Sequence, residues 1–335
     1  MKWTTPVTVA TDKGFLTHGM PILMLGSCFA DNIGTYLQEC KFDVCLNPYG
    51  TLYNPDSIAC AIERLSENRP FEKNELHYDG NLWYSYMHHG SFSTAEADTT
   101  LHAINDSYEK AAHLLPHCQR LIVTWGTAYV YKLKETGKTV ANCHKQPEKI
   151  FERSRMGVDE IVERWEAITK LLQTYAPQCR ILLTVSPIRH LRDGAHPNQL
   201  SKATLLLAAD ALCNRHPEMY SYFPAYEIVM DELRDYRFYA EDLTHPSAAA
   251  VAYIRERFAE TYFTPQTASL AAACEKIATG LRHRPLKGCD TPAYRRFATS
   301  LLQQMETLTN DCNAIDYTQE KNDIKQLLQH NGNEL

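Results

Sequence analysis

The chain lacks a long apolar run, an excess of positive charge and the close cysteine pairing of redox and zinc motifs. No apolar stretch of its 335 residues approaches the ~20 residues needed to span a bilayer. The balance of 34 Lys and Arg against 40 Asp and Glu gives a net charge of −6, which argues against nucleic acid or an anionic membrane as the main partner. The 11 cysteines show no CxxC spacing, so we expect reduced thiols. We expect neither a metal nor a cofactor.

The first 19 residues mix threonine, aspartate, lysine and histidine and contain no continuous apolar core, so they do not resemble a signal peptide. We therefore expect a cytoplasmic protein. Hydrophobic residues make up 44% of the chain, enough to bury one large core and a smaller appendage. The sequence predicts a main domain over residues 1–265 and a helical extension over residues 266–335.

Short apolar runs alternate with amphipathic segments along the main domain. Such runs are typical of buried parallel strands, and apolar residues at helical spacing are typical of helices packed on a sheet. The expected strands are residues 22–25, 42–46, 121–125, 180–185 and 226–230. The expected helices are residues 30–39, 159–175, 198–215 and 246–263. This alternation predicts an α/β fold, a three-layer α/β/α sandwich with a mostly parallel sheet, in which ligands bind beyond the carboxyl ends of the strands.

Two inserts interrupt the alternation, near residues 67–93 and 132–155, and long insertions at this edge of a sheet often form substrate walls. The first insert predicts an antiparallel hairpin packed through its aromatic residues. Because neighbouring strand residues point to opposite faces, at most one of its two adjacent histidines faces the site, and His89 is that candidate. After Pro265, three helices that dock on the core or form a homodimer contact are expected at residues 267–281, 292–308 and 318–330.

The most informative stretch is PILMLGSCFA at residues 21–30, which places Ser27 at a junction between a strand and a helix. Gly26 permits a tight turn, and the first free N–H groups of the helix can stabilise an oxyanion, so the position suits a nucleophile. The alternative is an ordinary strand exit in which Ser27 caps the helix. Cys28 lies beside it at the helix N-terminus, where a thiolate is favoured, and is a second candidate nucleophile.

A second stretch, EDLTHPS at residues 241–247, supplies a matching acid and base. Pro246 disfavours helical backbone at His245 and suits the first helical position, so His245 is expected in a turn just before a helix. Asp242 can hold one ring nitrogen of His245 as a donor, which leaves the other to accept a proton from Ser27. The alternative is a helix start in which Asp242 or Thr244 caps the first turn.

The residues GSCFA at positions 26–30 resemble the signature of the GSCFA family, which is similar to the SGNH, or GDSL-like, hydrolases. Further stretches that resemble the family are NPYGT at 47–51, TWGT at 124–127, NCHK at 142–145 and TVSPIRH at 184–190. The resemblance covers roughly residues 1–265. It implies a catalytic domain with Ser27 as nucleophile and an Asp-x-x-His pair, here Asp242 and His245, as acid and base.

The same resemblance implies an oxyanion hole built from the Ser27 N–H, a glycine N–H after the second strand and an asparagine side chain after the third. Gly50 fits the glycine role. Ala128 stands where the asparagine is expected, so the usual third donor is missing. Asn142 in the second insert is the candidate that would supply it, and a turn asparagine is the alternative.

Other polar residues near the carboxyl ends of the strands are candidate substrate contacts: His89, Gly126, Thr127, His144 and Arg189. Arg189 suits an anionic or polyhydroxylated substrate, and the alternative for it is a salt bridge that anchors its loop.

The helix expected at residues 198–215 presents two faces. Its predicted buried face consists of Leu200, Ala203, Leu207 and Leu212. The expected cap and surface residues are then Asn198, Ser201 and Lys202. The family resemblance leaves open the alternative that these three residues face the cleft.

Together these elements predict a serine esterase or O-acyltransferase, in which Ser27 attacks an acyl carbonyl and His245 acts as general base and then as general acid. Water as acceptor gives hydrolysis and a sugar hydroxyl gives transfer. The resemblance suggests O-acetylated carbohydrate as the substrate class. Two alternatives stay open: a binding protein that has lost the chemistry, and catalysis through Cys28.

Overall fold

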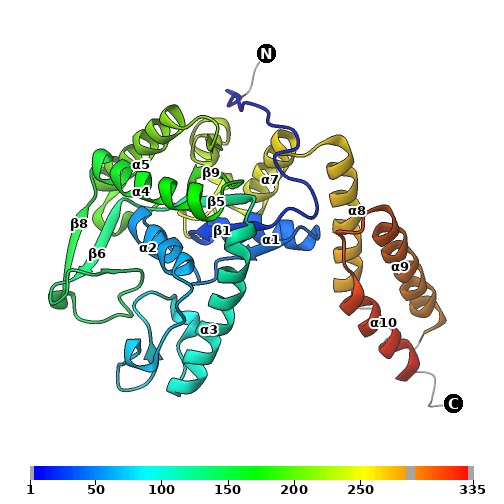
Figure 1. Cartoon of the computed structure of the whole chain (residues 1–335). Helices are drawn as coiled ribbons and strands as arrows, with labels where there is room; N and C mark the ends of the chain where they lie inside the picture. The colour runs from blue at the N-terminus through cyan, green and yellow to red at the C-terminus, as the bar shows by residue number, and fades with distance from the viewer. Residues whose placement is uncertain (1–3, 284–290, 331–335) are drawn as a thin grey trace. The chain divides into compact units, whose positions relative to one another are not determined.

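The computed structural model describes residues 4–283 and 291–330 (Figure 1). The chain forms two compact units. The first contains Met1–Ala10, Pro21–Gly34 and Val44–Phe258, and the second contains Thr11–Met20, Thr35–Asp43 and Ala259–Leu335. All candidate site residues belong to the first unit.

A five-stranded sheet forms the centre of the first unit, in the order β10-β9-β5-β1-β2. Every neighbouring pair in it is parallel, as the continuous apolar runs predict. The strands are β1 (Ile22–Gly26), β2 (Val44–Leu46), β5 (Arg120–Trp125), β9 (Arg180–Val185) and β10 (Tyr220–Tyr222).

Helices cover both faces of this sheet. The α-helices of the first unit and its borders are α1 (Cys28–Glu39), α2 (Pro55–Ser66), α3 (Ala97–Leu114), α4 (Val158–Tyr175), α5 (Ala195–Arg215), α6 (Ala225–Glu227) and α7 (Ala248–Tyr262). Short 3₁₀ turns are η1 (Lys73–Glu75), η2 (Gly90–Phe92), η3 (Leu115–His117), η4 (Glu148–Ile150), η5 (Leu191–Asp193) and η7 (Tyr236–Phe238), and η6 (Ile228–Glu232) is π-helical.

Both faces of the sheet are buried. Alternate strand residues pack with α2, α3, α4 and α5 in one apolar cluster; they include Leu23, Leu25, Leu121, Val123, Ile181 and Leu183. The residues between them, Ile22, Met24, Ile122 and Leu182, point the other way and are also buried. Figure 1 shows α1 and α7 on the opposite side of β1 from α2. The three-layer α/β/α sandwich predicted from the sequence is therefore confirmed.

Two predictions about local structure are wrong. Residues 226–230 do not form a strand, because they lie in α6 and η6, and the edge strand is β10. A short apolar run does not distinguish a strand from a buried helical turn. Helix α5 also turns a different face inward: Leu200 and Leu207 are 40% and 59% exposed, whereas Asn198 and Lys202 are buried.

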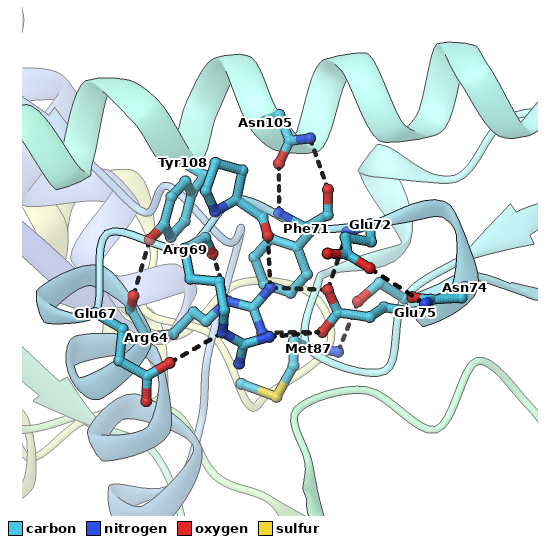
Figure 2. Close-up of polar contacts among 12 residues, drawn as sticks. Arg64, Glu67, Arg69, Phe71, Glu72, Asn74, Glu75, Met87, Asn105 and Tyr108 are labelled. Carbon is cyan, nitrogen blue, oxygen red and sulfur yellow. Dashed lines mark hydrogen bonds and ion pairs between the residues drawn. The ribbon is translucent and has the colours of Figure 1, made fainter.

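The first insert contains the expected antiparallel hairpin, β3 (His77–Tyr78) and β4 (Trp83–Tyr84), and is anchored by Arg64 of α2. The Arg64 guanidinium pairs with both carboxylate oxygens of Glu75, at 2.9 and 2.8 Å (Figure 2). It also donates to the backbone oxygens of Arg69 and Pro70 and lies 4.1 Å from the ring centroid of Phe71. The planar fork of arginine suits this arrangement, which fixes the insert to the main domain.

The second insert belongs to a three-stranded antiparallel sheet in the order β7-β6-β8. Its strands are β6 (Tyr129–Leu133), β7 (Thr139–Val140) and β8 (Phe151–Arg155). Because β6 follows β5 after a short turn, this sheet extends from the carboxyl edge of the central sheet, where the sequence places the candidate site residues.

After α7, the described part of the second unit contains α8 (Pro265–Arg282), α9 (Pro292–Asp311) and α10 (Thr318–His330). They match the helices predicted after Pro265. Within the described residues, no helix has the length and apolar character needed to cross a membrane.

Candidate functional site

Gly26 and Ser27 connect β1 to α1 at the carboxyl edge of the sheet. A Cβ on Gly26 would lie 2.5 Å from the backbone oxygen of Thr124, so glycine allows β1 and β5 to approach this closely. Ser27 is fully buried, and its Oγ accepts a hydrogen bond from the N–H of Phe29 at 3.3 Å. Ser27 therefore occupies the N-cap position of α1, the alternative that its sequence left open.

Cys28, the first residue of α1, points toward the histidine of the Asp-x-x-His turn. Its Sγ lies 3.8 Å from Nε2 of His245. Burial, followed by the negative charge of Asp31, raises the pKa of the Cys28 thiol, while backbone N–H groups at the start of α1 and the Lys202 charge oppose this rise. The N–H groups at the start of α1 thus favour the thiolate, as the sequence predicts, but burial outweighs them and the pKa of the thiol is raised overall.

Asp242 and His245 are held in one turn just before α7. Oδ1 of Asp242 accepts the backbone N–H groups of Thr244 and His245, both at 2.9 Å, and Oδ2 lies 2.5 Å from Nδ1 of His245. These hydrogen bonds, first those from the backbone, hold the pKa of Asp242 well below its usual range. A carboxylate at Nδ1 makes this nitrogen the donor, so Nε2 presents its lone pair to the Cys28 thiol.

A pocket of about 340 Å³ opens at this point, and both Cys28 and His245 line it. The size is that of a small-molecule site. Aromatic, cationic and amide side chains form its walls, among them Tyr53, Tyr129, Tyr131, Arg153, Arg189, Arg192 and Asn198.

Asn198 contributes a buried amide to this pocket, with only 3% of the residue exposed. Its Oδ1 accepts the backbone N–H of His190 at 2.9 Å, which determines the orientation of the amide. Its Nδ2 has no hydrogen-bond partner among the described residues. Because buried polar groups are nearly always paired, this donor is available to a ligand. Burial lowers the pKa of the adjacent His190 to about 4, so that ring is neutral near pH 7.

Two family comparisons cover most of the chain. Residues 21–258 match the GSCFA family, and residues 274–330 match the C-terminal domain of GSCFA domain proteins. The chain belongs to the GSCFA family. Among curated proteins, none matches this chain.

Lys202 is the most deeply buried charge near the site of this GSCFA protein, with 1% of the residue exposed. Its Nζ donates to the backbone oxygens of Gly126 and Ser186, each at 2.6 Å, just beyond the ends of β5 and β9. No carboxylate of the described residues pairs with it. Burial, and then the charge of Arg189, lowers the pKa of Lys202 to about 7. A buried cation without an anion is unfavourable for folding, which is typical of functional sites.

The burial of Lys202 predicts a specific pH dependence of stability. Between pH 7 and the ordinary lysine pKa of about 10.4, the unfolded chain holds a proton that the folded protein has released. The free energy of unfolding should therefore rise with pH in this window, by up to about 1.4 kcal/mol per pH unit. Urea unfolding at pH 7.0 to about 7.5 measures the slope well below the ordinary thiol pKa of about 8.5. Lys202→Met should remove this component, and an unchanged slope in the variant would contradict the assignment.

Two oxyanion candidates from the sequence have other partners. The Gly50 N–H donates to the backbone oxygen of Asn47 at 2.7 Å, and Gly50 has a φ of 72°. A Cβ there would lie 2.3 Å from Cβ of His89, so the glycine shapes this turn. Oδ1 of Asn142 accepts the backbone N–H of His144 at 2.9 Å. Among the described residues that line the pocket, neither candidate is present.

The substrate contacts suggested at the end of β5 and β9 divide into pocket and non-pocket residues. Thr127 and Arg189 line the pocket, and Thr127 Oγ1 lies 3.1 Å from Oγ of Ser201. Gly126 is not among the described lining residues; its N–H donates to the backbone oxygen of Tyr53 at 2.8 Å. A Cβ on Gly126 would approach Nε2 of His190 to 3.1 Å.

The two histidines suggested from the inserts are hydrogen-bonded to the first insert: His89 within its own loop, and His144 from the second insert to the backbone of the first. Nδ1 of His89 accepts the backbone N–H of Ser91 at 3.2 Å. Nε2 of His144 lies 2.9 Å from the backbone oxygen of Ser85 and 3.1 Å from that of His88. Neither histidine belongs to the described pocket lining.

The sequence predicts cap and surface positions for Asn198 and Lys202, with a place facing the cleft as the alternative; the structure places Asn198 in the pocket lining and buries Lys202 close to it. The sequence contains a pattern from which both residues could have been identified. Asn198, Ser201 and Lys202 share one helix face at i, i+3 and i+4, directly after the loop that follows β9. All three are buried, so a polar helix face beside a candidate site loop identifies this wall of the pocket.

Proposed function

We propose that this protein is an acyltransferase or esterase whose nucleophile is Cys28, with His245 as general base and Asp242 as the residue that orients it. The 3.8 Å distance from Cys28 Sγ to His245 Nε2 carries the proposal. The Ser27 hydroxyl is fully buried and already accepts the N–H of Phe29, whereas the Cys28 thiol lines the pocket. The proposal retains the acid and base predicted from the sequence and assigns the nucleophile to Cys28 instead of Ser27.

The first half-reaction transfers the acyl group to sulfur. The Cys28 thiol gives its proton to Nε2 of His245 as Sγ attacks the acyl carbonyl. The tetrahedral intermediate then expels the alcohol oxygen, which takes the proton from Nε2. The product is a thioester on Cys28 and a neutral alcohol. Because the pKa of the thiol is raised by burial, proton transfer to His245 is a required part of this step.

The second half-reaction releases the acyl group. His245 removes a proton from water or from an acceptor hydroxyl, and the resulting oxygen nucleophile attacks the thioester carbonyl. Sulfur leaves as thiolate and recovers the proton from His245. Water as acceptor makes the protein an esterase, and a sugar hydroxyl makes it an O-acyltransferase. Asp242 stays ionised throughout, because its three hydrogen bonds in the turn favour the carboxylate.

Two donors suit the oxyanion of each tetrahedral intermediate. The backbone N–H of Cys28 lies in the first turn of α1, where N–H groups have no partner within the helix. The Nδ2 of Asn198 is the second, since it lines the same pocket without a described partner. It would replace the asparagine donor for which Ala128 stands in the sequence.

Resemblance to the SGNH hydrolases adds support for acyl chemistry, because those enzymes also place a nucleophile after the first strand and an Asp-x-x-His near the end of the domain. O-acetylated carbohydrate is the first substrate class to test. The cytoplasmic location, the absence of nucleic-acid partners and a homodimer contact through the C-terminal helices stay predictions.

Trapping the acyl-enzyme tests the proposal directly. The full chain is mixed with p-nitrophenyl acetate, quenched in acid and digested, and the acetylated residue is located by mass spectrometry. We expect acetyl on Cys28 as a thioester that neutral hydroxylamine removes, and much less of it in His245→Ala. Cys143→Ala is the matched control, because Cys143 is another half-buried cysteine outside the described pocket lining. A hydroxylamine-stable ester on Ser27, or no acetyl on either residue, would overturn the proposal.

A further inference from the structure

Arg189 lies beside the catalytic turn. It follows β9, and its backbone N–H donates to the backbone oxygen of Thr244 at 3.4 Å, within the Asp242–His245 turn. Its side chain lines the pocket that contains Cys28 and His245. Arg189 also borders a second pocket, lined by Met230 and Tyr239 among others, so the residue lies between that pocket and the space in which an acyl substrate would be attacked.

The guanidinium of Arg189 has no acidic partner among the described residues. Its Nη1 has Met230 Sδ at 3.9 Å, the Tyr239 hydroxyl is a second polar neighbour, and its Nε is buried without a partner. The sulfur contact is weak, and a neutral phenol does not balance a positive charge. Several of the donors of Arg189 thus remain available to a ligand.

The other two arginines of the pocket are already paired. Arg153 binds both carboxylate oxygens of Asp193, at 2.9 and 2.5 Å, and Arg192 binds Glu148. The pocket therefore contains one guanidinium that is unpaired within the described structure and two that are neutralised. Because the other two arginines of the pocket have carboxylate partners, the lack of a carboxylate at Arg189 is specific to its position in the pocket.

In its protonated form, Lys202 adds to the positive charge beside Arg189. Its ammonium group is bonded to two backbone oxygens and to no described carboxylate. The two cations repel each other, as the lowering of the Lys202 pKa by Arg189 indicates. An anion bound between the pocket wall and Cys28 would relieve this repulsion in a setting where water screens charge poorly.

We propose that Arg189 binds an anionic oxygen group of the substrate, a carboxylate or a phosphate, next to the carbonyl that Cys28 attacks. The proposal rests on the proposed acyl-transfer function and specifies its substrate class: an acyl compound with an anionic group near the scissile bond. The planar guanidinium fork matches the paired oxygens of either group. The binding energy would hold the carbonyl in place for attack rather than take part in the chemistry.

Calorimetric titration of full-length Cys28→Ala tests this binding without requiring turnover. The probes are monomethyl succinate, methyl phosphate and the neutral dimethyl succinate. We expect at least one anion to bind roughly 10-fold to 100-fold more tightly than the neutral diester, the range for hydrogen bonds to a charged group. A tighter carboxylate identifies a carboxylate substrate, and a tighter phosphate identifies a phosphorylated one. Equal affinity for the neutral and anionic probes would overturn the proposal.

Arg189→Gln in the same background should remove the preference for the anion, and Arg189→Lys should keep part of it. Arg192→Gln is the matched control, because that arginine lines the same pocket and is already paired with Glu148. It should retain the preference. Loss in Arg192→Gln with retention in Arg189→Gln would contradict the assignment. If acetyl trapping on Cys28 fails while anion binding depends on Arg189, the acyl-transfer function is refuted and the anion site is not.

Discussion

Cys28→Ala is expected to lower kcat for a small acyl ester by at least about 10⁴-fold, because the variant has no atom that can form the thioester. His245→Ala should have a similar effect, since the raised pKa of the Cys28 thiol makes a general base necessary. The double variant should be no worse than either single one, because both changes disable the same proton transfer. Steady-state kinetics with p-nitrophenyl acetate measure all three.

Ser27→Ala is the matched control at the neighbouring position. It removes the Oγ that accepts the Phe29 N–H, so we expect a loss of about 1 kcal/mol in stability, as for other N-cap serines, and retained turnover. Thermal unfolding and kinetics separate these effects. Cys28→Ser should also be inactive, because a serine hydroxyl at this point is a much weaker nucleophile near pH 7. Loss of turnover in Ser27→Ala together with activity in Cys28→Ser would return the nucleophile to Ser27.

Asn198→Asp is expected to lower kcat by about 10²–10³-fold with little change in KM, the usual effect of removing one oxyanion donor. The aspartate keeps an oxygen to accept the His190 N–H, which Asn198 accepts at 2.9 Å, but it cannot donate through Nδ2 when ionised. Asn198→Ala should lower kcat at least as much and also destabilise the loop, because the His190 N–H then loses its partner.

The control for Asn198 lies on the same helix. Asn214 of α5 is exposed and donates to Asp210, so Asn214→Ala should leave kcat unchanged. Kinetics and thermal unfolding of each variant distinguish a lost donor from a damaged fold. A large fall in kcat for Asn142→Ala, with none for Asn198→Asp, would instead assign the oxyanion donor to the second insert.

Much of the fold follows from local patterns. The runs 22–25, 121–125 and 180–185 are apolar without alternation, which is typical of strands buried on both faces, and each forms a central strand. The spacing of apolar residues in α4 likewise predicts its buried face, and Ile161, Trp165, Ile168 and Leu172 are all buried. These predictions succeed because the period and length of an apolar pattern identify an element and its buried face when the element packs against apolar surfaces.

The prediction of a strand at residues 226–230 failed because a five-residue apolar run satisfies both a strand and a buried turn of helix. The prediction of which face of α5 is buried failed for a related reason. Its leucines and its polar residues each occur at helical spacing, and which set is buried depends on what the helix packs against. Its N-terminal turns meet the carboxyl edge of β5 and β9, where free backbone oxygens accept the ammonium of Lys202.

The local sequence determines the turn that joins Asp242 to His245, because Pro246 restricts the backbone and the three-residue spacing brings the carboxylate to the ring. The local sequence does not determine which side chain contacts the imidazole ring. Ser27 and Cys28 are adjacent, and the direction of each depends on how β1 enters α1: the serine turns inward to cap the helix and the thiol turns toward His245. That direction, the place of Asn198 in the pocket lining and the burial of Lys202 arise from the packing of elements far apart in sequence, which no local pattern encodes.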